Sequence, residues 1–337
     1  MVAIIITMIM MFVMTLIVLG FAESTRRNQR ESLDTQLGMQ AYYAAETGVN
    51  DIVNGLNNNA GLIDHGDCNP FPYDNKTLPR TLTTDGSVAN TCLMVDSEPA
   101  SMVVDAISAS SESVVWDVHE ATDQAFQKLV FSWDPDVGAS GSCASPFGTY
   151  PTLSSWSCDR AVLRVDILRA DVAATDAATL AANTATLYLQ PRDSGAQGVT
   201  LNTFNSSASK ITAYQGSCDV DTGSDPSCAV TVDLVGAAAQ TARYYVRMTA
   251  LYHDAKNVTL TGIINNGPAH FKDGQVVVDS TGRAQDQLKR IRVRVPLTAS
   301  RPNIPTNAVQ SAGSTCKDIL IPGNNYLIGA CQGIWPN

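Results

Sequence analysis

The first 22 residues, Met1 to Ala22, contain no charged side chain and no proline. A helix over this run would be about 33 Å long, which is long enough to cross a bilayer. Beyond the run, apolar and small residues recur at intervals of three and four as far as Leu56. We therefore predict one helix from about residue 2 to about residue 55. Because a single domain cannot bury the first half of such a helix, that half needs a membrane or other copies of itself.

The second half of the predicted helix carries a stripe for burial and a stop signal. Gly55 and the asparagines from Asn57 to Asn59 provide the stop. Ala41 and Ala45 are four residues apart, a spacing that allows close approach of another helix or, equally, of the chain's own β domain. The expected stripe consists of Leu33, Leu37, Ala41, Ala45, Val49, Ile52 and Leu56.

The apolar run leads directly into the segment ESTRRNQRESLDTQLGMQAYYAAETGVNDIV. Together they resemble the N-terminal region of type IV minor pilins and pseudopilins, in which a hydrophobic stretch precedes a basic, Gln-rich turn and a QAxxAAExG motif. The resemblance covers residues 1–55. The residues that match the motif are Gln40, Ala41, Ala44, Ala45, Glu46 and Gly48.

The resemblance implies a structural subunit that polymerises into an extracellular helical filament. It implies cleavage by a prepilin peptidase, methylation of the first residue and assembly by inner-membrane pilus machinery. The subunit would be stored in the cytoplasmic membrane and then displayed at the cell surface. The expected filament-core residues are Met1, Ile4, Ile5, Ile6, Thr7, Met8, Met11, Phe12, Leu16 and Leu19.

The chain departs from this family at one position that matters for assembly. Many pilins carry a glutamate at the fifth mature position, which meets a neighbour's N-terminal amine, whereas this chain has Ile5 if Met1 is the mature start. The sequence leaves open what replaces this contact: the amine must reach water, a backbone carbonyl or a neighbour's side chain, and Thr7 is the only strongly polar side chain within two turns of Met1.

Two other interpretations of the N-terminus fit the sequence less well. A secretory signal peptide begins with basic residues, which are missing here. A plain membrane anchor usually gives way to a linker, whereas the helical pattern continues here. If the chain forms filaments, we expect it to be the major pilin, with a minor or tip pilin as the alternative. If it does not, the alternative is a monomeric, membrane-anchored, adhesin-like surface protein. Motility, adhesion, DNA uptake and secretion are not distinguished.

The eight cysteines fall into four neighbouring pairs, separated by 24, 15, 10 and 15 residues. None has the CxxC spacing of zinc ribbons or redox pairs, and each pair brackets a stretch rich in turn-forming residues. These pairs predict four local disulfides and an oxidising compartment. The expected disulfides are Cys68–Cys92, Cys143–Cys158, Cys218–Cys228 and Cys316–Cys331.

After residue 57 short alternating segments replace the helical period, which predicts an α+β fold: a helix over residues 1–56 and a β-rich, disulfide-stapled extracellular domain over 57–337. The stretch 138–158 is either a loop or a subdomain boundary, and 171–186 either a short helix or a loose connection. Alternation is clearest at residues 163–168, 243–248 and 290–295. Further strands are expected near 101–106, 128–133, 185–190, 229–235, 256–264 and 274–279.

Chemistry-bearing motifs are scarce. The four histidines show no metal-ligand spacing, and the hydrolase elbow and the phosphate-binding loop are both missing, so we expect neither an enzyme nor a bound cofactor. The acidic loop with Asp219, Asp221 and Asp225 suits either a calcium ion or a solvated hairpin tip. A net charge of -10 disfavours general nucleic-acid binding.

Overall fold

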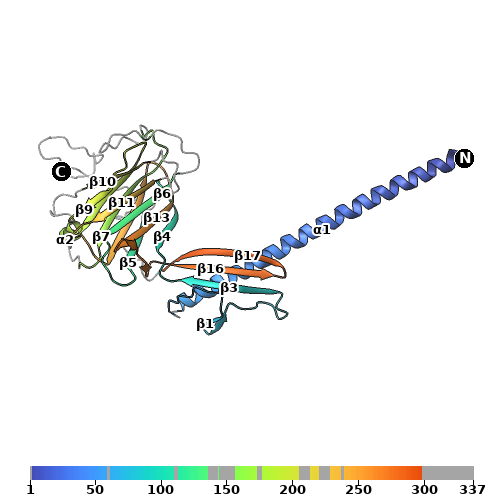
Figure 1. Cartoon of the computed structure of the whole chain (residues 1–337), viewed down its shortest axis with the longest axis horizontal. Coiled ribbons are helices and arrows are strands. Elements are labelled where there is room, and N and C mark those ends of the chain that lie inside the picture. Colours follow the sequence, from blue (N-terminus) through green and yellow to red (C-terminus); the bar gives the residue numbers. More distant parts are fainter. Residues whose placement is uncertain are drawn as a thin grey trace, which may run out of the picture. The chain divides into compact units, whose positions relative to one another are not determined.

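The structure, a computed structural model, describes residues 2–58, 61–109, 113–135, 143, 156–172, 177–204, 213–219, 228–236 and 239–297. The chain divides into two compact units, Met1–Pro302 and Asn303–Asn337, and every described residue belongs to the first. Within that unit one long helix precedes a series of β-sheets (Figure 1). The expected α+β class is therefore confirmed.

The helix α1 spans Val2–Asn57, so the helix predicted from the sequence is confirmed at both ends to within two residues. Its stripe is confirmed only in part. Leu33 is exposed and Leu37 is half-buried, whereas Ala41, Ala45, Val49 and Ile52 are buried. The predicted stripe begins too close to the N-terminus of the helix, because the strands that cover α1 do not reach Leu33.

A three-stranded antiparallel sheet covers the buried part of α1. Its order is β17 (Gln287–Pro296), β16 (Gln275–Ala284) and β3 (Val88–Asp96), with β16 in the centre. Figure 1 shows these three strands alongside the helix. A hydrophobic cluster joins the helix to this sheet and to the hairpin of β1 (Phe71–Tyr73) and β2 (Lys76–Leu78).

Two six-stranded sheets form a sandwich around a second, larger hydrophobic cluster, to which both contribute inward side chains. One has the order β10 (Ala213–Asp219), β8 (Thr184–Arg192), β7 (Val162–Arg169), β12 (Arg243–Leu251), β5 (Ser113–Glu120) and β15 (Phe271–Lys272). The other has the order β14 (Gly267–Pro268), β13 (Ala255–Ile264), β6 (Lys128–Asp134), β11 (Cys228–Leu234) and β9 (Val199–Leu201), with β4 (Ser101–Ile107) paired to β13.

Every strand predicted from alternation is found. In β7 and β12 the alternating apolar residues are fully buried, and the polar residues between them are more exposed, apart from the buried Asp166. The short helix α2 (Ala177–Ala182) falls in the stretch where a short helix was one of two expectations. Two long strands, β3 and β5, were not predicted, and neither were β1, β2, β9, β10, β14 and β15. Most of residues 138–158 lie outside the described part of the chain.

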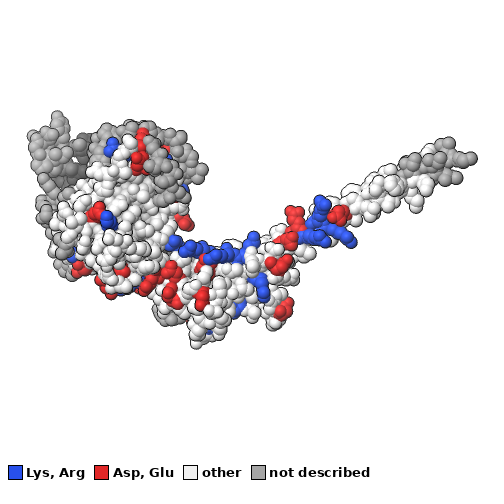
Figure 2. Space-filling model, viewed as in Figure 1, with Lys and Arg blue, Asp and Glu red and all other residues white. Residues whose placement is uncertain are grey.

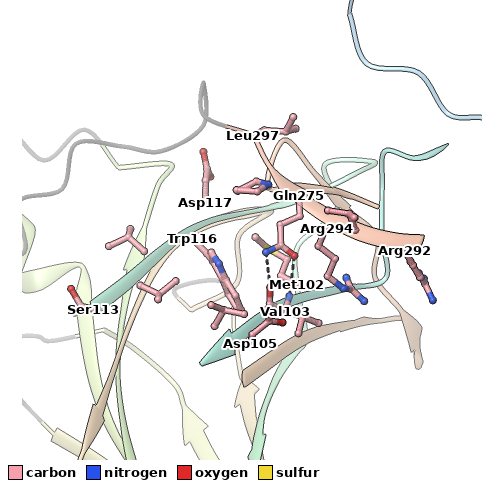
Figure 3. A pocket seen from close by; sticks show the side chains of 16 residues that line it. Met102, Val103, Asp105, Ser113, Trp116, Asp117, Gln275, Arg292, Arg294 and Leu297 are labelled. Atoms are coloured by element: carbon pink, nitrogen blue, oxygen red, sulfur yellow. Dashed lines mark hydrogen bonds between the residues drawn. The ribbon is translucent and has the colours of Figure 1, made fainter. Parts of the chain in front are cut away.

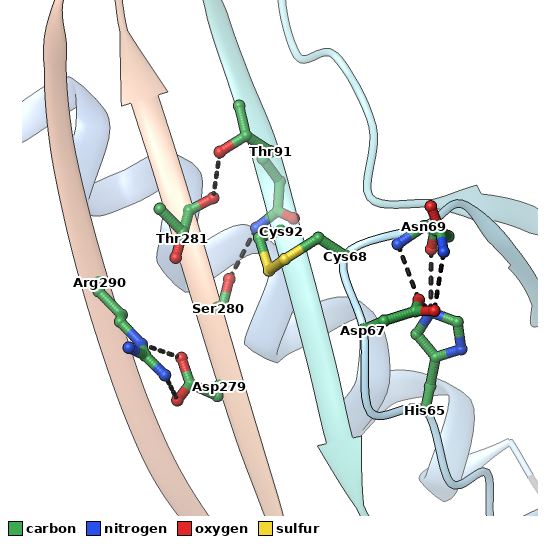
Figure 4. Close-up of a disulfide and its surroundings, with 11 residues drawn as sticks. His65, Asp67, Cys68, Asn69, Thr91, Cys92, Asp279, Ser280, Thr281 and Arg290 are labelled. Atoms are coloured by element: carbon green, nitrogen blue, oxygen red, sulfur yellow. Dashed lines mark hydrogen bonds and ion pairs between the residues drawn. A yellow bond between two sulfur atoms is a disulfide. The ribbon is translucent and has the colours of Figure 1, made fainter.

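Three of the expected disulfides form. They are Cys68–Cys92, Cys143–Cys158 and Cys218–Cys228, with Cα–Cα distances of 4.5, 4.5 and 5.3 Å. Figure 4 shows the first, which ties the segment before β1 to β3. The expected pair Cys316–Cys331 lies outside the described residues.

Candidate assembly surface

The first part of α1 presents apolar side chains to its surroundings. Met8, Phe12 and Phe21 are 75%, 66% and 72% exposed. Exposed apolar residues follow one another around the whole circumference of the helix rather than along one stripe, so one flat partner could not cover them. The exposed large apolar residues of this segment are Ile6, Met8, Met10, Met11, Phe12, Val13, Met14, Leu16, Ile17, Val18, Leu19 and Phe21.

The predicted filament-core residues divide into two groups. Those whose side chains are described are all exposed, namely Ile6, Met8, Met11, Phe12, Leu16 and Leu19. Met1 and the side chains of Ile4, Ile5 and Thr7 lie outside the described part, so the candidate role of Thr7 stays a prediction. In the part of the chain that the structure describes, no helix is both long enough and apolar enough to cross a membrane.

A charged collar ends the exposed apolar segment. Glu23 and Arg27, one turn apart, approach to 3.6 Å, and both side chains are well exposed. Such a pair contributes little to stability, because water screens it. The collar therefore marks where the surface changes from apolar to charged. Its charged residues are Glu23, Arg26, Arg27, Arg30, Glu31 and Asp34.

Beyond the collar, small residues let α1 press closely onto β16. Ala41, Ala44 and Ala45 are buried. At Gly282 of β16 an added Cβ would overlap the backbone of Ala41 and Ala45, and one on Gly48 would overlap Ser280 and Asn90. The small residues of the QAxxAAExG motif thus pack against the chain's own sheet, which settles the alternative that the sequence left open.

Buried hydrogen bonds fix the position of the helix on the sheet. The Ser280 hydroxyl donates to the carbonyl oxygen of Ala45 at 2.6 Å and accepts from the Asn90 amide at 2.6 Å. The same amide lies 3.4 Å from the carbonyl oxygen of Ala44. Since buried polar groups are costly unless they are paired, these bonds favour one register of helix on strand.

A buried carboxylate anchors the last turns of α1. Asp51 is 4% exposed and accepts hydrogen bonds from Lys76 at 2.7 Å and from Arg80 at 2.8 and 3.3 Å. Burial alone would raise the pKa of Asp51, but the bonds from Arg80 and Lys76 outweigh it and hold the pKa below its ordinary value. The ionised form of Asp51 therefore ties the helix to the segment that follows β1.

Sequence reasoning did not find Asp51, Asn90 or Ser280 as docking residues. Their partners lie far away along the chain, and a polar residue beside an apolar stripe normally faces water. Gly282 did carry a signal, because a glycine inside a strand often marks a close approach of another backbone.

In the described part of the chain, no group of three or more His, Cys, Asp or Glu is placed to hold a metal ion. Of the acidic-loop residues only Asp219, at the end of β10, is described. Asp221 and Asp225 lie outside the described residues.

The helix thus has a docked half, fixed by close packing and by buried bonds, and an apolar half without a partner among the described residues. Such a surface offers packing rather than chemistry. No family model, no curated protein and no solved structure matches the chain.

Proposed function

We propose that the chain is a structural subunit of an extracellular filament of the type IV pilus kind. In this proposal the first part of α1 packs against the same part of other copies, and the β-rich region is displayed outside. The observation that carries the proposal is the run of exposed apolar side chains between Ile6 and Phe21 on a helix whose other half is buried against the chain's own sheet. A continuous run of exposed apolar side chains on a helix marks an interaction site.

The energetic case rests on burial. Complete burial of one large apolar side chain contributes roughly 1.5–3 kcal/mol. Several such side chains per subunit would offset the entropy that is lost when copies associate. The exposed methionines suit this role, because their flexible thioethers fill irregular gaps between helices.

The docked half of α1 supports the same proposal. A subunit that transmits load along a filament must couple its helix firmly to its displayed region. The close contact at Gly282 and the anchor at Asp51 supply such a coupling.

The proposed location is the cytoplasmic membrane before assembly and the cell surface afterwards. The three disulfides support the second step, because such bonds persist in oxidising compartments outside the cytoplasm. The membrane step, the prepilin peptidase and the assembly machinery rest on the N-terminal resemblance alone.

The proposal is tested by placing one charge on the apolar helix surface. Val13→Asp should abolish filaments, because a carboxylate in a dry helical core costs several kcal/mol. The matched control is Gln36→Asp, which introduces the same side chain on an exposed position beyond the collar. Electron microscopy of material sheared from the producing cells gives the readout, with immunogold labelling to show where the protein lies.

Three results are distinguishable. Labelling along the whole filament, lost only with Val13→Asp, supports a major subunit. Labelling at filament ends alone indicates a minor or tip subunit. Normal filaments from the Val13→Asp chain, or labelled protein without filaments in the unsubstituted chain, would leave the monomeric, adhesin-like alternative.

A further inference from the structure

Strands β4 and β5 each leave one long edge without a neighbouring strand among the described residues. The ladder of β4 is formed with β13. Strand β5 pairs with β12 on one side, while on the other side β15 covers only His119 and Glu120. Open strand edges present unpaired backbone N–H and C=O groups and are templates for another strand.

The hydrogen-bond pattern shows which groups of β5 face outward. The amide of Glu120 donates to Ala242 on the β12 side at 2.9 Å, whereas that of Ala121 donates to His270 on the other side at 2.9 Å. Because bonding alternates along an antiparallel strand, the odd-numbered residues of β5 point away from β12. Ser113 and Val115 therefore present their backbone groups to the open edge.

The two open edges line one groove of about 840 Å³, to which β16 and β17 also contribute lining residues (Figure 3). There the Gln275 side chain accepts from the backbone N–H of Val103 at 3.0 Å and donates to its C=O at 2.7 Å. The backbone of Val103, on the open edge of β4, thus already binds the side-chain amide of Gln275 through the same two hydrogen bonds that a neighbouring strand would form. The indole of Trp116 forms an apolar wall.

Two guanidinium groups of β17 reach the same groove. Arg294 donates to the carbonyl oxygen of Ser101 at 2.8 Å, and Arg292 is exposed. Neither forms an ion pair with a carboxylate in the described part of the chain, in contrast to Arg290, which is paired with Asp279. In Figure 2 basic side chains form a row along β17.

The guanidinium of Arg294 lies in an unfavourable setting for a cation. Burial lowers the pKa of Arg294, and the neighbouring charge of Arg292 lowers it further, while Asp96 and Asp105 offset only part of this effect. An additional carboxylate at this place would relieve the repulsion between the two cations.

One side chain that lines the groove, Ser113, has a buried hydroxyl oxygen that forms no hydrogen bond to the described residues. A buried polar atom in this condition costs free energy.

We propose that this groove binds an extended peptide segment that carries a carboxylate, from a partner protein. The peptide backbone pairs with the open edge of β5 at Ser113 and Val115, and its carboxylate binds Arg292. The guanidinium group of Arg292, which forms no ion pair among the described residues, favours a negatively charged ligand, and the open strand edges favour an extended backbone. The site is independent of the apolar helix surface.

The test uses the full chain in detergent and six acetylated hexapeptides of alternating valine and threonine, in which one glutamate occupies each position in turn. Fluorescence anisotropy of the labelled peptides measures binding. We expect saturable binding of at least one peptide, weakened about tenfold or more when glutamine replaces its glutamate. A peptide N-methylated at one set of alternate amides should lose binding, whereas methylation of the other set should be tolerated.

Arg292→Gln should weaken the binding of the acidic peptide by a similar factor and leave the binding of the glutamine peptide unchanged. The matched control is Arg283→Gln, an exposed arginine of β16 away from the groove. The proposal is overturned if no acidic peptide binds, if the glutamine peptide binds equally well, or if both N-methylated forms bind. Self-association that Arg292→Gln abolishes, without peptide binding, would also overturn it and assign the groove to a second copy of the chain.

Discussion

Gly282 of β16 lies so close to Ala41 of α1 that no side chain fits between the two backbones. The helix therefore rests on the strand along a line of small residues rather than on a layer of large ones. This contact holds together two parts of the chain that are far apart in sequence.

Gly282→Ala should destabilise the docked half of the helix by about 1–3 kcal/mol or more, because the methyl group must push the helix off the strand. Gly38→Ala is the control: its Cβ would meet only the Lys289 side chain, at 3.6 Å. The control should be neutral or stabilising by up to about 1 kcal/mol. Denaturant unfolding followed by circular dichroism measures both, and equal midpoints for the two variants would argue against the close contact.

Asp51→Asn should destabilise the chain by about 1.5–3 kcal/mol at neutral pH, because Lys76 and Arg80 lose their charged acceptor. The folded-state pKa of Asp51 lies below its ordinary value of 3.8. Its stabilisation is therefore fully present above that value and is lost as the pH falls through the folded-state pKa. Unfolding midpoints of the two proteins should converge below about pH 4. A gap that stays constant down to pH 2 would contradict this assignment.

Peptide mapping without reduction should recover the pairs Cys68–Cys92, Cys143–Cys158 and Cys218–Cys228, together with the predicted Cys316–Cys331. Removing Cys68–Cys92 by a double serine substitution should cost about 3 kcal/mol, since it frees a loop of 24 residues in the unfolded chain. Crosswise pairing between the four groups would be the result that disproves local stapling.

Filaments should withstand high salt and dissociate in detergent. Salt weakens exposed ion pairs such as Glu23–Arg27 but strengthens apolar burial. Detergent competes directly for the exposed helix surface around Phe12. Light scattering of purified filaments over both titrations provides the measurement. Dissociation in moderate salt, with resistance to detergent, would show that charged contacts hold the copies together.

The fold was predictable wherever apolar and polar residues followed the repeat of a helix or of a strand throughout a segment. Strand β12 alternates without interruption, and its burial follows the alternation. Strand β5 was missed because Trp116, Asp117 and Val118 are buried in succession, which hides the period of two. Its Asp117 can be buried because Arg243, on the adjacent strand, pairs with it. Such compensation is invisible until the strands are aligned.

The candidate surface was predictable in its apolar half and not in its docked half. A long uncharged run with helical spacing can be recognised in the sequence itself as a surface that must be covered by a partner or a membrane. The bonds of Ser280 to Asn90 and to Ala45 join positions 190 and 235 residues apart, and no local pattern encodes them. The small residues of the helix permitted two kinds of neighbour, and only the tertiary structure distinguishes them.

The sheet that receives α1 is assembled from opposite ends of the described chain: β3 ends at Asp96, whereas β16 begins at Gln275. During synthesis the helix is made more than 200 residues before the strand on which it docks. For most of that time the small-residue face has nothing to dock on, and the apolar half already needs protection. A chain truncated before β16 would keep its helix undocked, because the close contact at Gly282 can form only after β16 has been synthesised.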